Sequence, residues 1–169
     1  KEVLGEMINR NGDDIPVSQL PDDGTYPTGT TKWEKRNIAL EIPIWEPDLC
    51  IQCGRCSFVC PHAAIRTKVY PTERLKNAPE TFKSTASKFR EWKDGYSWTV
   101  QVAPEDCVDC GLCVENCPAK DKTNPERHAI NMGAQPPIRE SEAKNWDFFL
   151  KLPLIPREEI STHLVKNSQ

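Results

Sequence analysis

All eight cysteines of the chain fall into two copies of one pattern, Cys-x-x-Cys-x-x-Cys-x-x-x-Cys-Pro. Three cysteines at two-residue gaps can wrap one corner of a compact iron–sulfur cube, and the fourth, which precedes a proline, points toward the other cluster. The pattern therefore predicts two [4Fe–4S] clusters with ligands exchanged between the two runs. Cluster 1 would be held by Cys50, Cys53, Cys56 and Cys117, and cluster 2 by Cys107, Cys110, Cys113 and Cys60.

Other uses of these cysteines are less consistent with their spacing. Structural zinc prefers cysteine pairs separated by longer loops. A disulfide framework is typical of small secreted domains, and the chain opens Lys-Glu-Val-Leu-Gly-Glu without the apolar region of a signal peptide. No Ser-His-Asp or paired-carboxylate arrangement predicts a catalytic residue in this segment. The chemistry expected here is electron transfer.

Composition limits the class of protein further. Hydrophobic residues make up 37% of the 169 residues, so the core is modest, and metal–thiolate bonds would help to hold the fold together. The net charge is −3 and no block of basic residues is present, which argues against nucleic acid and anionic membrane surfaces as partners. No apolar run is long enough to span a bilayer. We expect a cytoplasmic protein.

The repeat extends beyond the cysteines. Gly54 and Gly111 each follow the second cysteine of their run, and alternating apolar stretches at 38–44 and 97–102 precede the runs. These stretches predict short strands, of which the first contains Pro43 and is expected at a sheet edge. Apolar segments after each run, at 63–65 and 129–130, would cover the clusters. The expected fold is α+β: a two-[4Fe–4S] ferredoxin-like fold of two pseudo-two-fold β-α-β halves, over residues 38–133.

Insertions and extensions interrupt this symmetry. Residues 66–96 form an insertion, in which 79–93 could hold a helix that buries Phe82, Phe89 and Trp92. A second insertion, 120–128, is expected as a surface turn near the second cluster. Residues 1–37 form an N-terminal extension, with a short helix at 1–9, that links the domain to a larger enzyme. Residues 134–169 form a C-terminal tail whose aromatic patch, 146–152, is expected to dock on that enzyme.

Several segments outside the cysteines resemble one family. They are Tyr-Pro-Thr-Gly-Thr-Thr-Lys-Trp-Glu-Lys-Arg at 26–36, the residues around the first run at 45–53 and 58–66, Cys-Pro-Ala-Lys-Asp-Lys at 117–122, and Asn-Trp-Asp-Phe-Phe-Leu-Lys-Leu-Pro at 145–153. These segments resemble the ferredoxin-like domain of pyruvate:ferredoxin oxidoreductase, also called pyruvate synthase. The similarity covers nearly the whole chain and includes all eight ligand positions.

The resemblance implies a larger enzyme. That family decarboxylates pyruvate on thiamine diphosphate, transfers the acetyl group to coenzyme A, and passes single electrons through its clusters to ferredoxin or flavodoxin. Thiamine diphosphate, Mg²⁺, coenzyme A and a third cluster are expected elsewhere in the parent enzyme, which is expected to be a homodimer. The alternative left open is a two-cluster domain or subunit of another redox enzyme, such as a hydrogenase or a different 2-oxoacid oxidoreductase.

Overall fold

The computed structural model describes residues 3–26, 28–29 and 35–160, and it divides into two compact units, Lys1–Arg36 and Asn37–Gln169. The first unit contains α1 (Leu4–Ile8) and two 3-10 turns, Gly12–Asp14 and Val17–Gln19. The helix expected at 1–9 is therefore confirmed over five residues, although Met7 and Ile8 on it are exposed. Most of the 26–36 motif lies outside the described residues.

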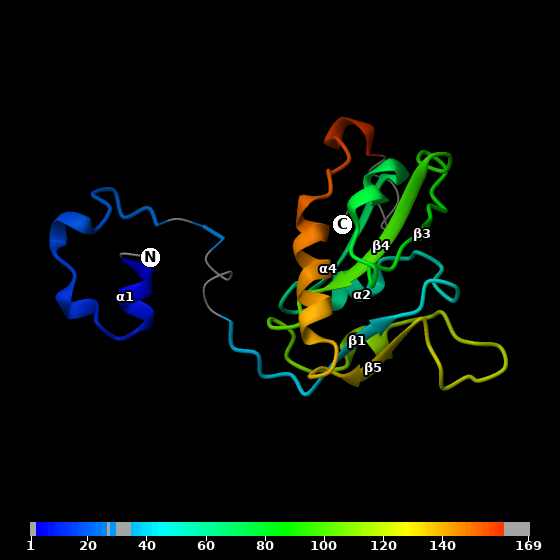
Figure 1. Ribbon diagram of the computed structural model, residues 1–169, viewed down its shortest axis with the longest axis horizontal. Coiled ribbons are helices and arrows are strands. Elements are labelled where there is room, and N and C mark those ends of the chain that lie inside the picture. Colours follow the sequence, from blue (N-terminus) through cyan, green and yellow to red (C-terminus); the bar gives the residue numbers. More distant parts are fainter. Residues whose placement is uncertain (1–2, 27, 30–34, 161–169) are drawn as a thin grey trace. The chain divides into compact units, whose positions relative to one another are not determined.

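The second unit is built from two β-α-β halves (Figure 1). The first half is β1 (Glu41–Trp45), α2 (Arg55–Val59) and β2 (Ile65–Pro71). The second half is β4 (Tyr96–Val102), α3 (Leu112–Glu115) and β5 (Ile130–Ala134). These elements confirm the α+β ferredoxin-like fold.

The halves are joined strand to strand. Strand β1 pairs antiparallel with β5, and β2 pairs antiparallel with β4, so each ladder takes one strand from each half. Because β1 has β5 as its only partner strand among the described residues, it is an edge strand and accommodates Pro43 there. This exchange brings the cysteine runs, which extend through α2 and α3, to one region of the unit, where the two helices are in contact.

The first insertion folds without the helix predicted at 79–93. It contains a 3-10 turn (Thr72–Asn77) and the short strand β3 (Thr85–Ala86), which extends the sheet to the order β2-β4-β3. Its aromatic residues are nevertheless buried: the Phe89 ring lies 5.2 Å from Trp98 and 6.1 Å from Trp92, centroid to centroid. Ser87 competes against a helix here because its hydroxyl accepts the Phe89 N–H at 3.3 Å.

The C-terminal tail also differs from the expectation. Helix α4 (Arg139–Lys151) runs along the sheet in Figure 1, and its Trp146 and Phe149 pack with Leu152 against Tyr70 and Ala103. These three tail residues are buried within the chain and are not free to dock elsewhere. Among the described residues of the tail, the large hydrophobic side chains that are exposed are Leu150 and Leu154, and a 3-10 turn (Arg157–Glu159) follows them.

Lys68 fixes the C-terminal end of α4. Its ammonium group donates to the carbonyl oxygens of Phe149 and Leu152, each at 2.8 Å, and lies 4.6 Å from the Phe149 ring centroid. The last carbonyls of a helix lack partners within it and carry partial negative charge, so a lysine at this end stabilises it. The tail is therefore anchored to β2 by polar contacts as well as by burial.

Candidate iron–sulfur sites

The cysteine side chains gather around two pockets. The first pocket has about 330 Å³ of space, including open solvent, and is lined by cysteines from both runs together with mainly apolar residues. Its cysteines are Cys50, Cys53, Cys56 and Cys117. The second pocket has about 380 Å³ on the same measure. Its cysteines are Cys60, Cys107, Cys110 and Cys113.

Each pocket thus combines three cysteines of one run with the last cysteine of the other. These are the two sets that the sequence grouped as ligands of cluster 1 and cluster 2. Among residues 3–26, 28–29 and 35–160, no group of three or more His, Cys, Asp or Glu side chains is arranged to hold a single metal ion. Four sulfur donors around a roomy, largely apolar pocket fit a polynuclear iron–sulfur cluster.

Left-handed backbone positions shape the two cysteine loops alike. Gln52 and Asp109 precede the second cysteine of their runs and have φ of 58° and 60°. Gly54 and Gly111 follow that cysteine, have φ of 71° and 69°, and stand at the start of α2 and α3. The glycines are suited to this conformation because they have no Cβ. Each loop can therefore curl around its pocket and then enter a helix within a few residues.

Side chains at the two non-glycine positions hold the loops in place. Gln52 is buried; its amide donates to the Ala86 carbonyl at 2.8 Å, and its oxygen accepts the Lys88 N–H at 2.7 Å. Asp109 accepts the Glu41 N–H at 3.0 Å. The first loop is thus tied to the insertion and the second to β1. Neither residue is predicted as functional from the sequence, in which the only signal is their equivalent place in the repeat.

The segments after each run cover the pockets as expected. Ala64 and Ile65 line the second pocket, and Ala129 and Ile130 line the first. Ile65 and Ile130 also begin β2 and β5. Strand β2 therefore starts at the wall of the second pocket, which contains Cys60. Strand β5 starts at the wall of the first pocket, which contains Cys117.

Backbone N–H groups also point at the sulfurs. The Gln52 N–H donates to the Cys50 sulfur and the Ala64 N–H to the Cys60 sulfur, both at 3.3 Å. Such bonds favour a thiolate, and hydrogen bonds to sulfur tune the reduction potential of a bound cluster.

Burial and mutual repulsion disfavour free thiolates in these pockets. Burial raises the pKa of Cys50, and the neighbouring Cys53 and Cys117 add to the rise, while the Trp45 indole directed at the sulfur opposes it. Burial likewise raises the pKa of Cys107, with contributions from Cys60 and Cys110. A positively charged iron–sulfur core would compensate these thiolates, which is the chemistry that such a donor set supports.

The two pockets approach each other through their most buried cysteines. Burial raises the pKa of Cys113 to about 11, followed by repulsion from Cys107 and Cys110. Burial is also the main cause of the raised pKa of Cys56, and repulsion from Cys113 contributes. Cys56 and Cys113 also belong to one core cluster, so the two pockets adjoin at these cysteines.

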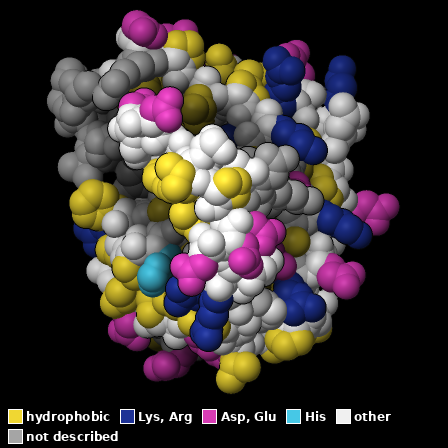
Figure 2. Space-filling view, turned by 90° about the vertical axis from the view of Figure 1, so that its left-hand side faces the viewer, with side chains coloured by type: hydrophobic (Ala, Val, Ile, Leu, Met, Phe, Trp, Pro, Cys, Tyr) yellow, Lys and Arg dark blue, Asp and Glu magenta, His cyan; other side chains and the backbone are white. Residues whose placement is uncertain are grey.

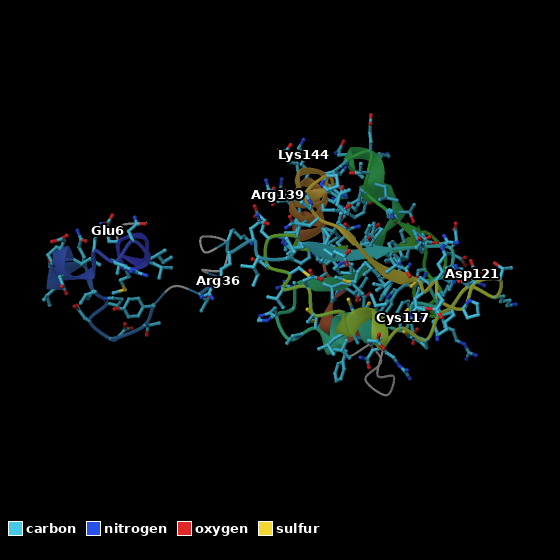
Figure 3. All side chains as sticks on the ribbon, turned by 90° about the horizontal axis from the view of Figure 1, so that it is seen from below. Glu6, Arg36, Cys117, Asp121, Arg139 and Lys144 are labelled. Atoms are coloured by element: carbon cyan, nitrogen blue, oxygen red, sulfur yellow. The ribbon has the colours of Figure 1, made fainter. Side chains whose placement is uncertain are left out.

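The second insertion lies beside the first pocket, not the second as expected. Ala119 and Ala129, which flank the insertion in sequence, line that pocket. Next to them in the chain, Lys120 and His128 form an isolated β-bridge that closes the base of the insertion. Arg127 forms ion pairs with Glu46 and with Asp121, the latter at 3.1 Å. In Figure 3, Asp121 lies farther out than Cys117. This place follows from the predicted crossing of the runs, since the insertion comes directly after Cys117, a cysteine of the first pocket.

The rest of the described chain offers few competing sites. His128 already bonds the Val114 carbonyl through Nδ1 at 3.0 Å, and His62 is an exposed residue at the rim of the second pocket. Lys and Arg side chains stand among Asp and Glu on the face in Figure 2. No described helix is long and apolar enough to cross a membrane.

Known families match the two parts of the chain separately. Residues 49–120 match the family described as a 4Fe-4S dicluster domain, and residues 1–39 match a domain of unknown function. The dicluster match includes all eight cysteines of the two pockets.

Curated relatives match nearly the whole chain. The pyruvate-flavodoxin oxidoreductase of Trichormus variabilis is 59% identical over 96% of this chain, and that of Nostoc sp. is 54% identical over 100%. The pyruvate:ferredoxin oxidoreductase of Moorella thermoacetica is 41% identical over 100%. The chain spans 14% of the length of each of these relatives. It carries a 4Fe-4S dicluster domain and is homologous, along its length, to a segment of the pyruvate-flavodoxin oxidoreductases.

Proposed function

We propose that this chain is the electron-relay segment of a pyruvate oxidoreductase. It carries single electrons through two [4Fe–4S] clusters, from a thiamine-diphosphate centre elsewhere in the parent enzyme to an external ferredoxin or flavodoxin. The observation that carries the proposal is the gathering of eight cysteines around two pockets, four in each. When bound, [4Fe–4S] clusters supply reversible one-electron chemistry.

The residues of the chain have separate roles in this relay. Cys50, Cys53, Cys56 and Cys117 hold cluster 1, and Cys60, Cys107, Cys110 and Cys113 hold cluster 2. Gln52 and Asp109 keep the loops in the ligating conformation, and apolar residues such as Ile65 and Ile130 keep water away from the clusters. Cys56 and Cys113, one from each set, lie in the same core cluster, and electrons would pass between the clusters on this side.

The parent enzyme supplies what this segment lacks. Thiamine diphosphate, Mg²⁺, coenzyme A and a third cluster belong to other parts of a homodimeric, cytoplasmic enzyme. Relatives named for flavodoxin and for ferredoxin both match this chain, so the sequence similarity supports either acceptor.

A ligand-exchange experiment in the full-length protein tests the proposal. Cys60→Ser should perturb the cluster of the second run, and Cys117→Ser the cluster of the first, because the last cysteine of each run serves the other cluster. Electron paramagnetic resonance after reduction with pyruvate and coenzyme A would show which signals change. Reciprocal changes support crossed ligation, whereas damage confined to the cluster of the substituted run contradicts it.

The same experiment separates the parent from its alternative. A domain of another redox enzyme would be reduced by dithionite but not by pyruvate with coenzyme A. Clusters that dithionite reduces but pyruvate does not would therefore support the electron-transfer function and contradict the assignment to a pyruvate oxidoreductase. Absence of acid-labile sulfide would remove both.

A further inference from the structure

Two indole N–H groups in the second unit are buried without a hydrogen-bond partner. They belong to Trp45, with 5% of its surface exposed, and Trp98, with 3% exposed. Within the described parts of the chain, no other buried side-chain nitrogen or oxygen lacks a partner. A buried donor without an acceptor destabilises a fold, so unpaired groups of this kind point to a missing partner.

Both indoles lie close to the first pocket. Trp98 lines it together with Val100. Trp45 does not line it, but its indole lies near enough to the Cys50 sulfur to lower the pKa of that thiol, without forming a hydrogen bond to it. Both rings lie in one core cluster with Cys56 and Ile130. The donors thus come from β1 and β4, the two strands that precede the cysteine runs, and both lie beside cysteines of the first pocket.

Sulfur is the acceptor that this pocket offers. Apart from its cysteines, the pocket is lined by backbone and side chains that include no carboxylate, hydroxyl or amide side chain. A neutral thiol is a weak acceptor, whereas cluster-bound thiolates and inorganic sulfides carry negative charge and accept well. The two N–H groups are therefore poised for a sulfur-rich, negatively charged occupant.

The second pocket has no equivalent pair. The repeat places Val102 where the first half has Trp45, and Glu41 where the second half has Trp98. Val102 lines the second pocket and cannot donate a hydrogen bond, and Glu41 is exposed. The side chain with N–H groups at that pocket is the exposed His62. The pseudo-two-fold symmetry is broken at the position that matters for hydrogen bonding to sulfur.

We propose that the indole N–H groups of Trp45 and Trp98 donate hydrogen bonds to sulfur atoms of cluster 1 and raise its reduction potential. This inference rests on the proposed function, since it needs a cluster in the first pocket. Reduction adds negative charge to the cluster, and N–H dipoles aimed at its sulfurs stabilise the reduced form more than the oxidised form. Two such donors on one cluster make the two clusters energetically unequal.

Tryptophan-to-phenylalanine variants of the full-length protein test the inference. Trp98→Phe and Trp45→Phe keep an aromatic ring and remove only the N–H with part of the ring. Redox titration followed by electron paramagnetic resonance should show a more negative midpoint potential for one cluster, the one that Cys117→Ser perturbs. Trp92→Phe is the matched control, because Trp92 is buried in the same core but neither lines the pocket nor carries one of the two unpartnered N–H groups.

A measurement on the unsubstituted protein guards against variants that fail to assemble. Protein labelled with ¹⁵N in the tryptophan indoles should show, in pulsed electron paramagnetic resonance, magnetic coupling between the indole nitrogens and reduced cluster 1. The coupling should lose one component in each of Trp45→Phe and Trp98→Phe, and none in Trp92→Phe.

The outcomes distinguish this inference from the function on which it rests. Two clusters with unchanged potentials in both variants, or without ¹⁵N coupling, would overturn the role of the indoles and leave the relay intact. A protein without a cluster in the first pocket would overturn both.

Discussion

Gln52 is the residue that most directly connects the iron–sulfur loops to the rest of the fold. It adopts a left-handed backbone conformation and is almost fully buried. Its side-chain amide forms hydrogen bonds to the insertion through both its nitrogen and its oxygen. The neighbouring Lys88 ammonium also donates to the Cys50 carbonyl at 2.7 Å. The first insertion therefore supports the ligand geometry of Cys50 and Cys53 from outside the pocket.

We expect Gln52→Ala to lower the free energy of unfolding by about 1–3 kcal/mol, because it leaves the Ala86 carbonyl and the Lys88 N–H without their buried partner. Urea denaturation of the holoprotein under anaerobic conditions measures this. Asp109→Ala is the matched control at the equivalent position; its partner, the Glu41 N–H, is at an exposed site where water can replace the carboxylate. Equal losses in the two variants would contradict the role of burial.

The sequence predicts the cysteine ligands well, but it does not predict the residues that hold the cysteine loops in place. Eight cysteines at fixed spacing encode a cluster motif locally, so the two sets of four could be written down from the runs alone. Gln52 could not be found in the same way, since its partners lie 34 and 36 residues away and their position depends on how the insertion folds.

Helix α4 is the element whose role changes most between sequence and structure. Strand β4 is buried on both faces: Trp98, Val100 and Val102 face the core around the pockets, while Ser97, Thr99 and Gln101 are also buried. These polar side chains form hydrogen bonds to one another and to the insertion; for example, the Thr99 hydroxyl donates to the Lys83 carbonyl at 2.7 Å. An alternating pattern of this kind usually predicts one solvated face. The polar face of β4 is therefore expected to be solvated, and its burial beneath the C-terminal helix α4 could not be predicted from the sequence.

We expect Phe149→Ala to lower the free energy of unfolding by about 3–5 kcal/mol, the usual cost of removing a fully buried aromatic side chain. Phe149 is 1% exposed and stacks on Trp146 with the ring centroids 5.1 Å apart. Leu150→Ala, at the next position but 51% exposed, should cost under about 1 kcal/mol. Chemical denaturation of both variants decides between a tail packed on this chain and one bound elsewhere, which would make both substitutions mild.

A second property of α4 depends on pH. Burial raises the pKa of Glu142, although its bond from the Asn145 amide at 3.3 Å opposes the rise. The folded protein therefore binds this proton more tightly than the unfolded chain does. The contribution of Glu142 to the free energy of unfolding is fully present below its pKa in the unfolded chain. It is lost as the pH rises through its pKa in the folded protein. Glu142→Gln should flatten the decline in stability over that window, which thermal unfolding at a series of pH values would detect. An unchanged pH profile would contradict a half-buried carboxyl with a raised pKa at this place.

At the scale of the whole second unit, the structure depends on its two pockets. Helices α2 and α3 have five and four residues, far below the length at which isolated helices are stable in water. Cys56 and Cys113 are members of the main hydrophobic core cluster, so the ligands and the core occupy the same space. Without clusters, that core would surround two cavities and a set of thiols whose ionisation is mutually unfavourable.

The two ladders should respond differently to loss of iron. The β1–β5 ladder is a two-stranded sheet, which is marginally stable alone, and its Trp45 and Ile130 lie in the core cluster that contains Cys56 and Cys113. The β2–β4 ladder has β3 as a third strand and α4 as a cover, with Tyr70, Phe149 and Trp146 forming a second core cluster away from the cysteines. Both ladders border the pockets, since Ile65 of β2 and Val102 of β4 line the second one. The β2–β4 ladder differs in having a third strand, a covering helix and a second core cluster that can hold it without iron.

We therefore expect graded removal of iron by a chelator to unfold the β1–β5 ladder before the β2–β4 ladder. Hydrogen exchange read by mass spectrometry, on the full-length protein during anaerobic chelation, would follow peptides from 41–45 and 130–134 against peptides from 65–71 and 96–102. Protection should fall first in the former pair, because among the described residues those strands have no third strand to support them once the clusters are lost, whereas β2 and β4 keep β3 and α4. The control is Phe149→Ala with its clusters intact, which should reverse the order by weakening the cover of β2 and β4. Simultaneous loss in both ladders would show that the clusters stabilise the unit as one cooperative whole. Lasting protection of β1–β5 without iron would show that this ladder does not need them.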